Sequence, residues 1–224
     1  MTFSIVARCM STGMFGVAVA SSSPAVAARC AYAAAGIGAV ASQNVTDPEL
    51  GPRILELMAR GASATEAVEI VRRTARHADY RQVLAVDFNG LSAIHSGPKA
   101  LGIWAEARAG NVACGGNLLA NSGVPQAMVD AFLSHRGDLG DRLVVTMRAA
   151  LAAGGEAGPV HSAGLKLVRD VAWPVADLRC DWTNDCPIEQ VAMLWDLYKP
   201  QLEAYVTRAS DPSAAPSYGV PGNE

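Results

Sequence analysis

The sequence contains few of the short motifs that identify a function. It has no C-x-x-C pair and neither an H-x-x-x-H nor an H-E-x-x-H motif, and its four histidines are widely spaced. Because metal sites usually group their ligands at characteristic spacings, we expect no metal and no cofactor. Neither a G-x-S-x-G motif nor a P-loop is present. The common signatures of serine hydrolases and nucleotide-binding proteins are therefore missing.

Clusters of positive charge are also scarce. Arg72-Arg73 is the main basic pair, and the net charge of the 224 residues is −3. Nucleic acid is therefore not an expected partner. The apolar run over residues 25–41 is rich in Gly and Ala, is interrupted by Arg29, and is too short to cross a bilayer. We expect no membrane association.

Cysteine usage indicates the cellular compartment. The five cysteines are an odd number, which favours reduced thiols in a cytoplasmic protein. A local bridge between Cys180 and Cys186 is the alternative. No basic segment precedes an apolar run at the N-terminus, so we expect no signal peptide and a cytoplasmic location.

The first forty residues predict strands. Residues 2–8 and 15–21 form a hairpin around Gly13, and residues 26–34 and 36–42 are expected to form a second pair. Several of these segments are apolar on both faces, which indicates a sheet that is covered on both sides.

Helices and strands then follow in blocks. Ser63 and Glu66 form a capping box that opens a helix, and Asn89-Gly90 between apolar runs predicts a hairpin. A long helical pattern over residues 188–207 is expected to kink or break at Pro200. The remaining predicted helices cover residues 48–60, 63–76, 125–134 and 139–153, and the remaining strands cover 82–88, 91–95, 105–107, 111–114, 163–169 and 175–179.

This order of elements indicates the architecture. The strands and helices do not alternate as they do in a βαβ fold, so we predict an α+β protein in which two packed sheets are covered outside by helices. Residues 1–209 form one domain. Residues 210–224 form a Pro/Gly-rich tail whose composition alone suggests a loose segment.

Thr2 is the sharpest candidate for catalysis. Removal of Met1 would leave a free α-amine and a hydroxyl on one residue, which together supply a base and a nucleophile. With Met1 attached, the Thr2 nitrogen is an amide and cannot act as a base. Small residues such as Thr also follow Met commonly, without any catalytic role.

The N-terminal hairpin resembles the N-terminal-nucleophile (Ntn) hydrolases, such as proteasome β-subunits. The whole chain resembles the domain-of-unknown-function family 1028. Five segments carry this resemblance: MTFSIVA from Met1, FGVAVAS from Phe15, GIGAVASQ from Gly36, GGNLLA from Gly115 and PSYGVPG from Pro216. The resemblance implies a four-layer αββα sandwich but no agreed reaction. It also implies that the tail packs on the domain or on a neighbouring subunit.

The resemblance suggests where supporting residues lie. Ser21 stands where the superfamily often has a carboxylate, and Arg29 lies near the position of a basic residue that lowers the pKa of the nucleophile. Asn44 and Asn117 are candidates to stabilise an oxyanion. Ser21, Arg29, Gln43 and His161 are the candidates to contact the substrate. Ordinary roles as a surface arginine, a loop cap or a turn are the alternatives for these residues.

Two functions remain open at this point. The first is an Ntn-type amidohydrolase that acts on a small amide or peptide-like substrate through Thr2. The second is a non-catalytic binding or assembly protein of the same fold, with its N-terminus blocked by Met1. A homo-oligomer is expected in either case, because the helices have broad apolar faces.

Overall fold

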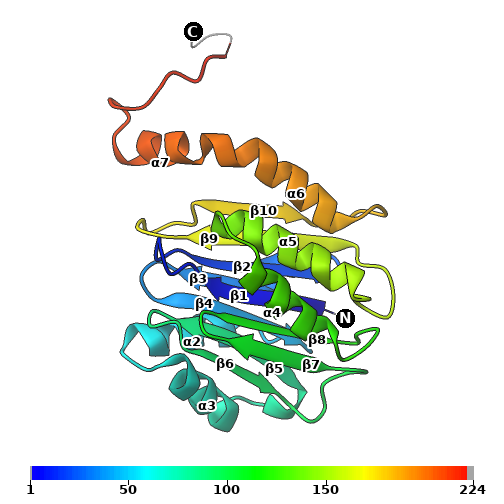
Figure 1. Cartoon of the computed structure of the whole chain (residues 1–224). Coiled ribbons are helices and arrows are strands. Elements are labelled where there is room, and N and C mark those ends of the chain that lie inside the picture. Colours follow the sequence, from blue (N-terminus) through cyan, green and yellow to red (C-terminus); the bar gives the residue numbers. More distant parts are fainter. Residues whose placement is uncertain (1, 221–224) are drawn as a thin grey trace.

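A computed structural model describes residues 2–220. Its strands form two antiparallel sheets that pack face to face (Figure 1). Sheet A has the strand order β10-β9-β2-β1-β8-β7, and sheet B has the order β3-β4-β5-β6. The strands of sheet A are β1 (Thr2–Arg8), β2 (Phe15–Ser21), β7 (Ala105–Ala109), β8 (Val112–Asn117), β9 (Ser162–Val168) and β10 (Ala176–Cys180). Those of sheet B are β3 (Ala31–Ala34), β4 (Gly38–Asn44), β5 (Arg81–Asp87) and β6 (Ser92–Ser96).

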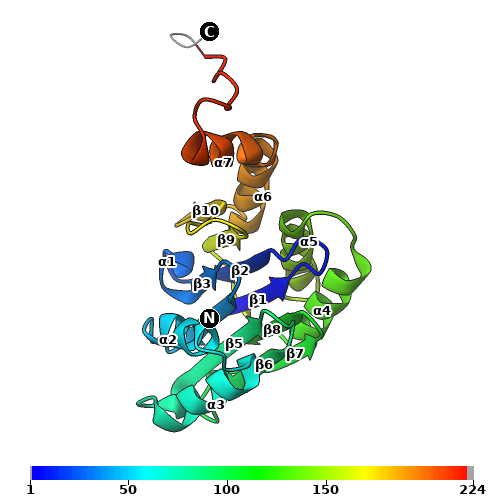
Figure 2. The ribbon, with the colours of Figure 1, turned by 90° about the vertical axis from the view of Figure 1, so that its left-hand side faces the viewer.

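Helices cover the outer face of each sheet (Figures 1 and 2). Sheet A is covered by α4 (Val124–Ser134), α5 (Leu139–Ala152) and α6 (Pro187–Tyr198), and sheet B by α2 (Leu50–Ala59) and α3 (Ala64–Thr74). Apolar residues fill the spaces between these four layers in three separate clusters. The predicted α+β class and the αββα layering are therefore confirmed. None of the described helices has the length and apolar character needed to span a bilayer.

Several local signals match the elements they predicted. Ser63 caps α3, and both hydrogen bonds of the capping box with Glu66 are present. The hairpin at Asn89-Gly90 joins β5 to β6. The long C-terminal helix breaks where Pro200 lies, because the short 3₁₀ turn η2 (Lys199–Gln201) separates α6 from α7 (Leu202–Ser210). A second 3₁₀ turn, η1 (Ala78–Tyr80), precedes β5.

The predicted strand over residues 26–34 is wrong for its first half. Residues Val26–Cys30 form the short helix α1, and only Ala31–Ala34 are extended. The side chains of Val26, Ala27 and Cys30 lie in the core between the sheets. A short run of Ala, Val and Cys has no periodicity that separates a helix from a buried strand. The tertiary contacts therefore decided its conformation.

The described part of the tail contacts α7. The Arg208 guanidinium lies 3.8 Å from the centre of the Tyr218 ring and donates to the carbonyl oxygens of Pro216 and Ser217. Beyond α7 the tail extends away from the two sheets (Figure 2). Its packing against a neighbouring subunit remains a prediction.

Candidate functional site

Thr2 begins a central strand of sheet A. Strand β1 pairs with β2 on one side and with β8 on the other. Because side chains alternate along a strand, Phe3 and Ile5 pack toward the helices while Val6 packs between the sheets. Thr2 and Ser4 share the face of Val6, so both side chains point toward sheet B.

Polar side chains gather where this face reaches the start of β1. We call them the inter-sheet polar cluster, and each is at most 5% exposed. Its members are Thr2, Ser4, Ser21, Gln43, Gln82 and Asn117. Asn117 is directly opposite Thr2 in the β1–β8 register, and the Thr2 hydroxyl donates to Ser21 Oγ at 3.3 Å. Burial of so many polar groups requires partners for them, and most of these partners lie within the cluster.

The amide groups of the cluster have a defined orientation. Gln82 Nε2 donates to the backbone carbonyl of Gly116 at 3.2 Å, which makes Gln82 Oε1 the acceptor. Gln43 and Asn117 both direct their amide N–H groups at that oxygen, at 2.8 and 3.2 Å. Gln43 Oε1 in turn accepts from the Ser4 hydroxyl at 2.6 Å. Since a backbone carbonyl can only accept, the contact with Gly116 determines the amide orientation of Gln82 and, through it, those of Gln43 and Asn117.

Asn117 presents an acceptor rather than a donor. Its amide N–H is used by Gln82, and its Oδ1 is buried without a hydrogen-bond partner among the described residues. An oxyanion requires a donor. The side chain of Asn117 therefore suits an ammonium or hydroxyl group better than the oxyanion role that the sequence suggested.

A second chain of hydrogen bonds leads from Thr2 to the surface. Ser21 Oγ lies 2.8 Å from Ser23 Oγ, and Arg29 Nη2 donates to Ser23 Oγ at 2.7 Å. Arg29 is half-buried on α1, and its guanidinium also donates to the carbonyls of Pro24 and Ala25. A cation is thus connected to the Thr2 hydroxyl through two serines, although Arg29 lies on a helix and not on the predicted strand.

A buried carboxylate lies beside the same residues. Glu156 is 4% exposed, and both of its oxygens accept from the backbone N–H of Ser22, at 3.2 and 3.3 Å. It pairs with Leu119 just beyond the end of β8. Burial raises the pKa of the Glu156 carboxyl to about 7. The positive charge of the N-terminal amine and the hydrogen bonds from Ser22 lower this pKa, but burial has the larger effect. A carboxylate with such a pKa can hold or release a proton near neutral pH.

Two predicted site residues serve mainly to hold loops. The Asn44 side chain donates to the carbonyl of Tyr80 and accepts from the N–H of Leu101, and its φ of 76° ends β4. His161 donates its backbone N–H to Ser21 O at 2.8 Å, which brings it next to the cluster. Its ring, however, contacts the carbonyl of Thr183 and stacks on Trp182 at 4.5 Å.

Sequence reasoning missed three residues of the site. Ser4 and Gln82 are polar residues at inward positions of otherwise apolar strands, and this pattern could have revealed them. Glu156 follows Gly154-Gly155 in an irregular segment, where no local pattern distinguishes it. Among the described residues, no three His, Cys, Asp or Glu side chains gather as metal ligands would.

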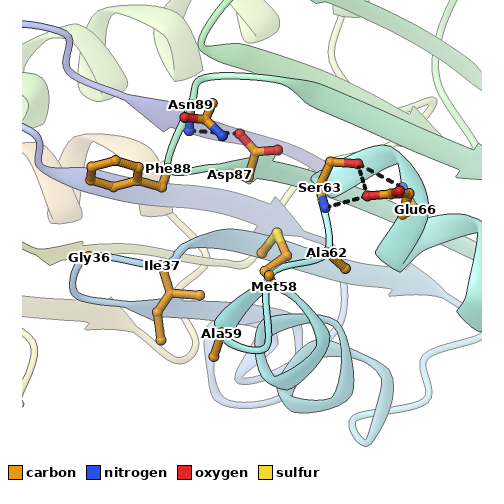
Figure 3. A pocket seen from close by; sticks show the side chains of 11 residues that line it. Gly36, Ile37, Met58, Ala59, Ala62, Ser63, Glu66, Asp87, Phe88 and Asn89 are labelled. Carbon is orange, nitrogen blue, oxygen red and sulfur yellow. Dashed lines mark hydrogen bonds between the residues drawn. The ribbon is translucent and has the colours of Figure 1, made fainter.

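A cavity of about 350 Å³ lies at the opposite end of β5 (Figure 3). Its acidic residues are already engaged by the chain itself. Asp87 accepts from the backbone N–H groups of Ala64, Asn89 and Leu91, and Glu66 closes the capping box with Ser63. These carboxylates therefore stabilise a turn and a helix start, and they offer little to a ligand.

Comparison with known proteins adds a family. The model of a family of unknown function, DUF1028, matches residues 2–191. A crystal structure of a DUF1028 protein from Silicibacter pomeroyi is 27% identical, with a TM-score of 0.82 over 88% of this chain and 89% of that one. Weaker matches are Anbu, the ancestral β-subunit, from Yersinia bercovieri (14% identity, TM-score 0.38) and an Anbu mutant from Hyphomicrobium sp. strain MC1 (10% identity, TM-score 0.41). Each of these two covers 91% of this chain and 97% of its own. No curated protein matches the sequence.

Proposed function

The chain belongs to DUF1028, a family of unknown function, and we propose that it is an N-terminal-nucleophile amidohydrolase that acts on a small amide or peptide-like substrate. Thr2 is the nucleophile once Met1 has been removed. The observation that carries the proposal is the contact of the Thr2 hydroxyl with Ser21 inside a buried polar cluster, at the first residue of a central strand.

The reaction needs one base and one nucleophile, and a processed Thr2 supplies both. Its α-amine takes the proton of the hydroxyl, and the oxygen then attacks the carbonyl carbon of the amide. The amide C–N bond breaks, the leaving amine receives the proton, and an ester joins the acyl group to Thr2. Water cleaves that ester and restores the hydroxyl. An amine with a pKa of about 8 in model peptides is suited to this exchange near neutral pH.

Two acceptors are available to orient the amine. Asn117 Oδ1 is buried opposite Thr2 without a partner among the described residues, and Glu156 binds Ser22 next to the Ser21 contact. We infer that the Thr2 ammonium donates to one or both of these oxygens. This would fix the direction of the amine lone pair after each proton transfer.

Arg29 is the candidate for lowering the pKa of the nucleophile. Its guanidinium is linked to the Thr2 hydroxyl by a chain of hydrogen bonds through the hydroxyls of Ser23 and Ser21. A cation at the end of such a chain favours the negative charge that develops on the threonine oxygen during attack. Because Arg29 is only half-buried, solvent ions can still reach it, and we expect salt to weaken its contribution.

The proposal is tested by trapping the acyl-enzyme. The full chain is incubated with a panel of small amides and dipeptides, and its intact mass is measured after rapid acid quenching. We expect an added acyl mass that maps to Thr2 and turnover of at least one compound. Thr2→Ser should keep adduct and turnover, since it keeps the hydroxyl, whereas Thr2→Ala should lose both and keep its melting temperature.

Thr207→Ala is the matched control, because this threonine lies on α7 and uses its hydroxyl only to bond the carbonyl of Glu203. It should react like the wild type. Turnover by Thr2→Ala at the wild-type rate would contradict the proposal. So would a folded protein that keeps Met1 and forms no adduct, which would favour the non-catalytic binding or assembly protein.

A further inference from the structure

A second polar site lies at the other end of β1. Arg8 ends that strand, and the loop after it meets the β7–β8 turn and the α4–α5 loop. Together they surround an open cavity of about 360 Å³. This cavity is separated from Thr2 by the length of β1, so its chemistry is independent of the proposed nucleophile.

The cavity has a strongly basic lining. Its polar side chains include Arg8, Cys9, Ser11, His135, Arg136 and Arg142, and none of its lining residues is Asp or Glu. Asp141 on α5 lies close enough to interact electrostatically with His135, but its carboxylate is bound by Trp195 and Lys199. Asp138 likewise pairs with Lys199 at 2.6 Å. The positive charge around the cavity is therefore not neutralised from its own walls.

Two of the arginines are held in place but lack a counter-charge. Arg142 stacks 3.7 Å over the Phe132 ring and donates to the carbonyl of Phe132, while Arg8 donates to Asn111 Oδ1. The Nε atom of each is buried without a hydrogen-bond partner among the described residues. No described carboxylate forms an ion pair with Arg8 or Arg142, in contrast to Arg148 and Arg169. Burial lowers the pKa of Arg142, and the nearby Cys9 thiol, whose anionic form raises that pKa, offsets this only in part.

A thiol lies among these cations. Cys9 is 5% exposed and borders the cavity, and its Sγ is 3.2 Å from Ser11 Oγ. Burial raises the pKa of Cys9, but hydrogen bonds from Ser11 and Thr12 more than offset this and bring it down to about 7. The same anion-stabilising surroundings would favour any other negative group that enters.

We propose that this cavity binds a small ligand with a carboxylate or phosphate group, which Arg8 and Arg142 hold beside the Cys9 thiol. Guanidinium groups bind both kinds of anion through paired N–H donors, and half-buried cations that lack an ion-pair partner gain most from such a ligand. Their fixed positions leave little side-chain entropy to lose on binding.

Two alkylating reagents of equal size test the proposal. Iodoacetate carries a carboxylate and iodoacetamide does not, and each reacts when a thiolate displaces iodide and forms a carbon–sulfur bond. Peptide mass spectrometry gives both rates for every cysteine at pH 7, so Cys180 and Cys186 serve as internal controls. We expect the ratio of the iodoacetate rate to the iodoacetamide rate to be about tenfold higher at Cys9 than at these controls. Arg142→Met should remove that preference, and Arg76→Met, which changes an exposed arginine elsewhere, should not.

Binding is measured separately, because Cys9 is largely buried. Inorganic phosphate and citrate are titrated against the melting temperature at a constant ionic strength set with chloride. We expect a saturable rise with at least one of them that is lost in Arg8→Met and Arg142→Met. A preference for phosphate or for citrate identifies the class of anion. If neither anion raises the melting temperature more than chloride does, or if the arginine variants respond like the wild type, the proposal is overturned.

Discussion

The layer between the two sheets has two different ends. At the Thr2 end it contains hydroxyls and carboxamides, whereas a few residues along the same strands it contains Val6, Val17, Leu84 and Val86. The same two sheets pack in both places, so the fold does not require the polar groups. Buried polar groups gain little net stability even when they are paired. The difference is what we would expect if the Thr2 end is the proposed active site.

The largest stability effect is expected at the apolar end. Leu84 and Gln82 lie two residues apart on the same face of β5, and both are fully buried. Leu84→Ala should lower the free energy of unfolding by about 3 kcal/mol, through lost apolar contact and a cavity. Gln82→Met should cost about 2 kcal/mol, because the amide groups of Gln43 and Asn117 lose their shared acceptor. Urea denaturation measures both.

The combined variant Gln43→Met, Gln82→Met, Asn117→Leu sharpens this comparison. Each single variant leaves amide groups of the other two residues without partners, whereas the triple variant removes all three amides together. The triple variant should therefore be more stable than the sum of the three single losses predicts. It should also lose turnover. A triple variant that is as unstable as that sum would mean that the polar end holds the fold together, which contradicts our interpretation.

Glu156 gives the polar end a pH dependence. Its pKa is about 7 in the folded protein, against 4.5 for an ordinary glutamate. The stability that it contributes is fully present below about pH 4.5 and is lost as the pH rises through 7, because the unfolded chain releases this proton first. Glu156→Gln should therefore gain roughly 2–3 kcal/mol of stability relative to the wild type between pH 5 and pH 8. Parallel stability curves of the two proteins over that range would show that Glu156 titrates normally.

Arg29 should affect rate rather than stability. Arg29→Met is expected to lower turnover about tenfold through loss of its charge, and Arg29→Lys should restore part of it. The difference between wild type and Arg29→Met should shrink in 0.5 M salt, because the Debye length falls from about 10 Å at 0.1 M to about 4 Å at 0.5 M. An equal decrease at every salt concentration would indicate a steric role for the arginine instead.

The smallest effect is expected at Asn44. Its side chain ties Tyr80 to Leu101, outside the inter-sheet polar cluster. Asn44→Gly keeps the backbone conformation at φ 76° and should cost about 1 kcal/mol, with turnover unchanged. If Asn44→Gly lost as much turnover as Asn117→Ala does, Asn44 would again be a candidate for a catalytic role.

The layers could be predicted from strand patterns, whereas the candidate site residues came largely from the resemblance to Ntn hydrolases, and their roles remain predictions. Strands that are apolar on both faces indicated a covered sheet. The structure places Thr2, Ser21, Gln43 and Asn117 together at the start of β1, which shows their proximity but not their roles. Glu156 could not be found in this way, since it reaches Ser22 across 134 residues from an irregular loop. The helix α1 was missed because its five residues are too few to show a period.

The most direct test of the central claim is the intact mass of the protein purified from its native host. Our account predicts a mass lower than that of the full sequence by one methionine residue, with Thr2 as the first residue in N-terminal sequencing. A protein that is fully active and still carries Met1 would contradict it, because the Thr2 nitrogen would then be an amide whose lone pair is delocalised into the carbonyl and cannot accept the proton.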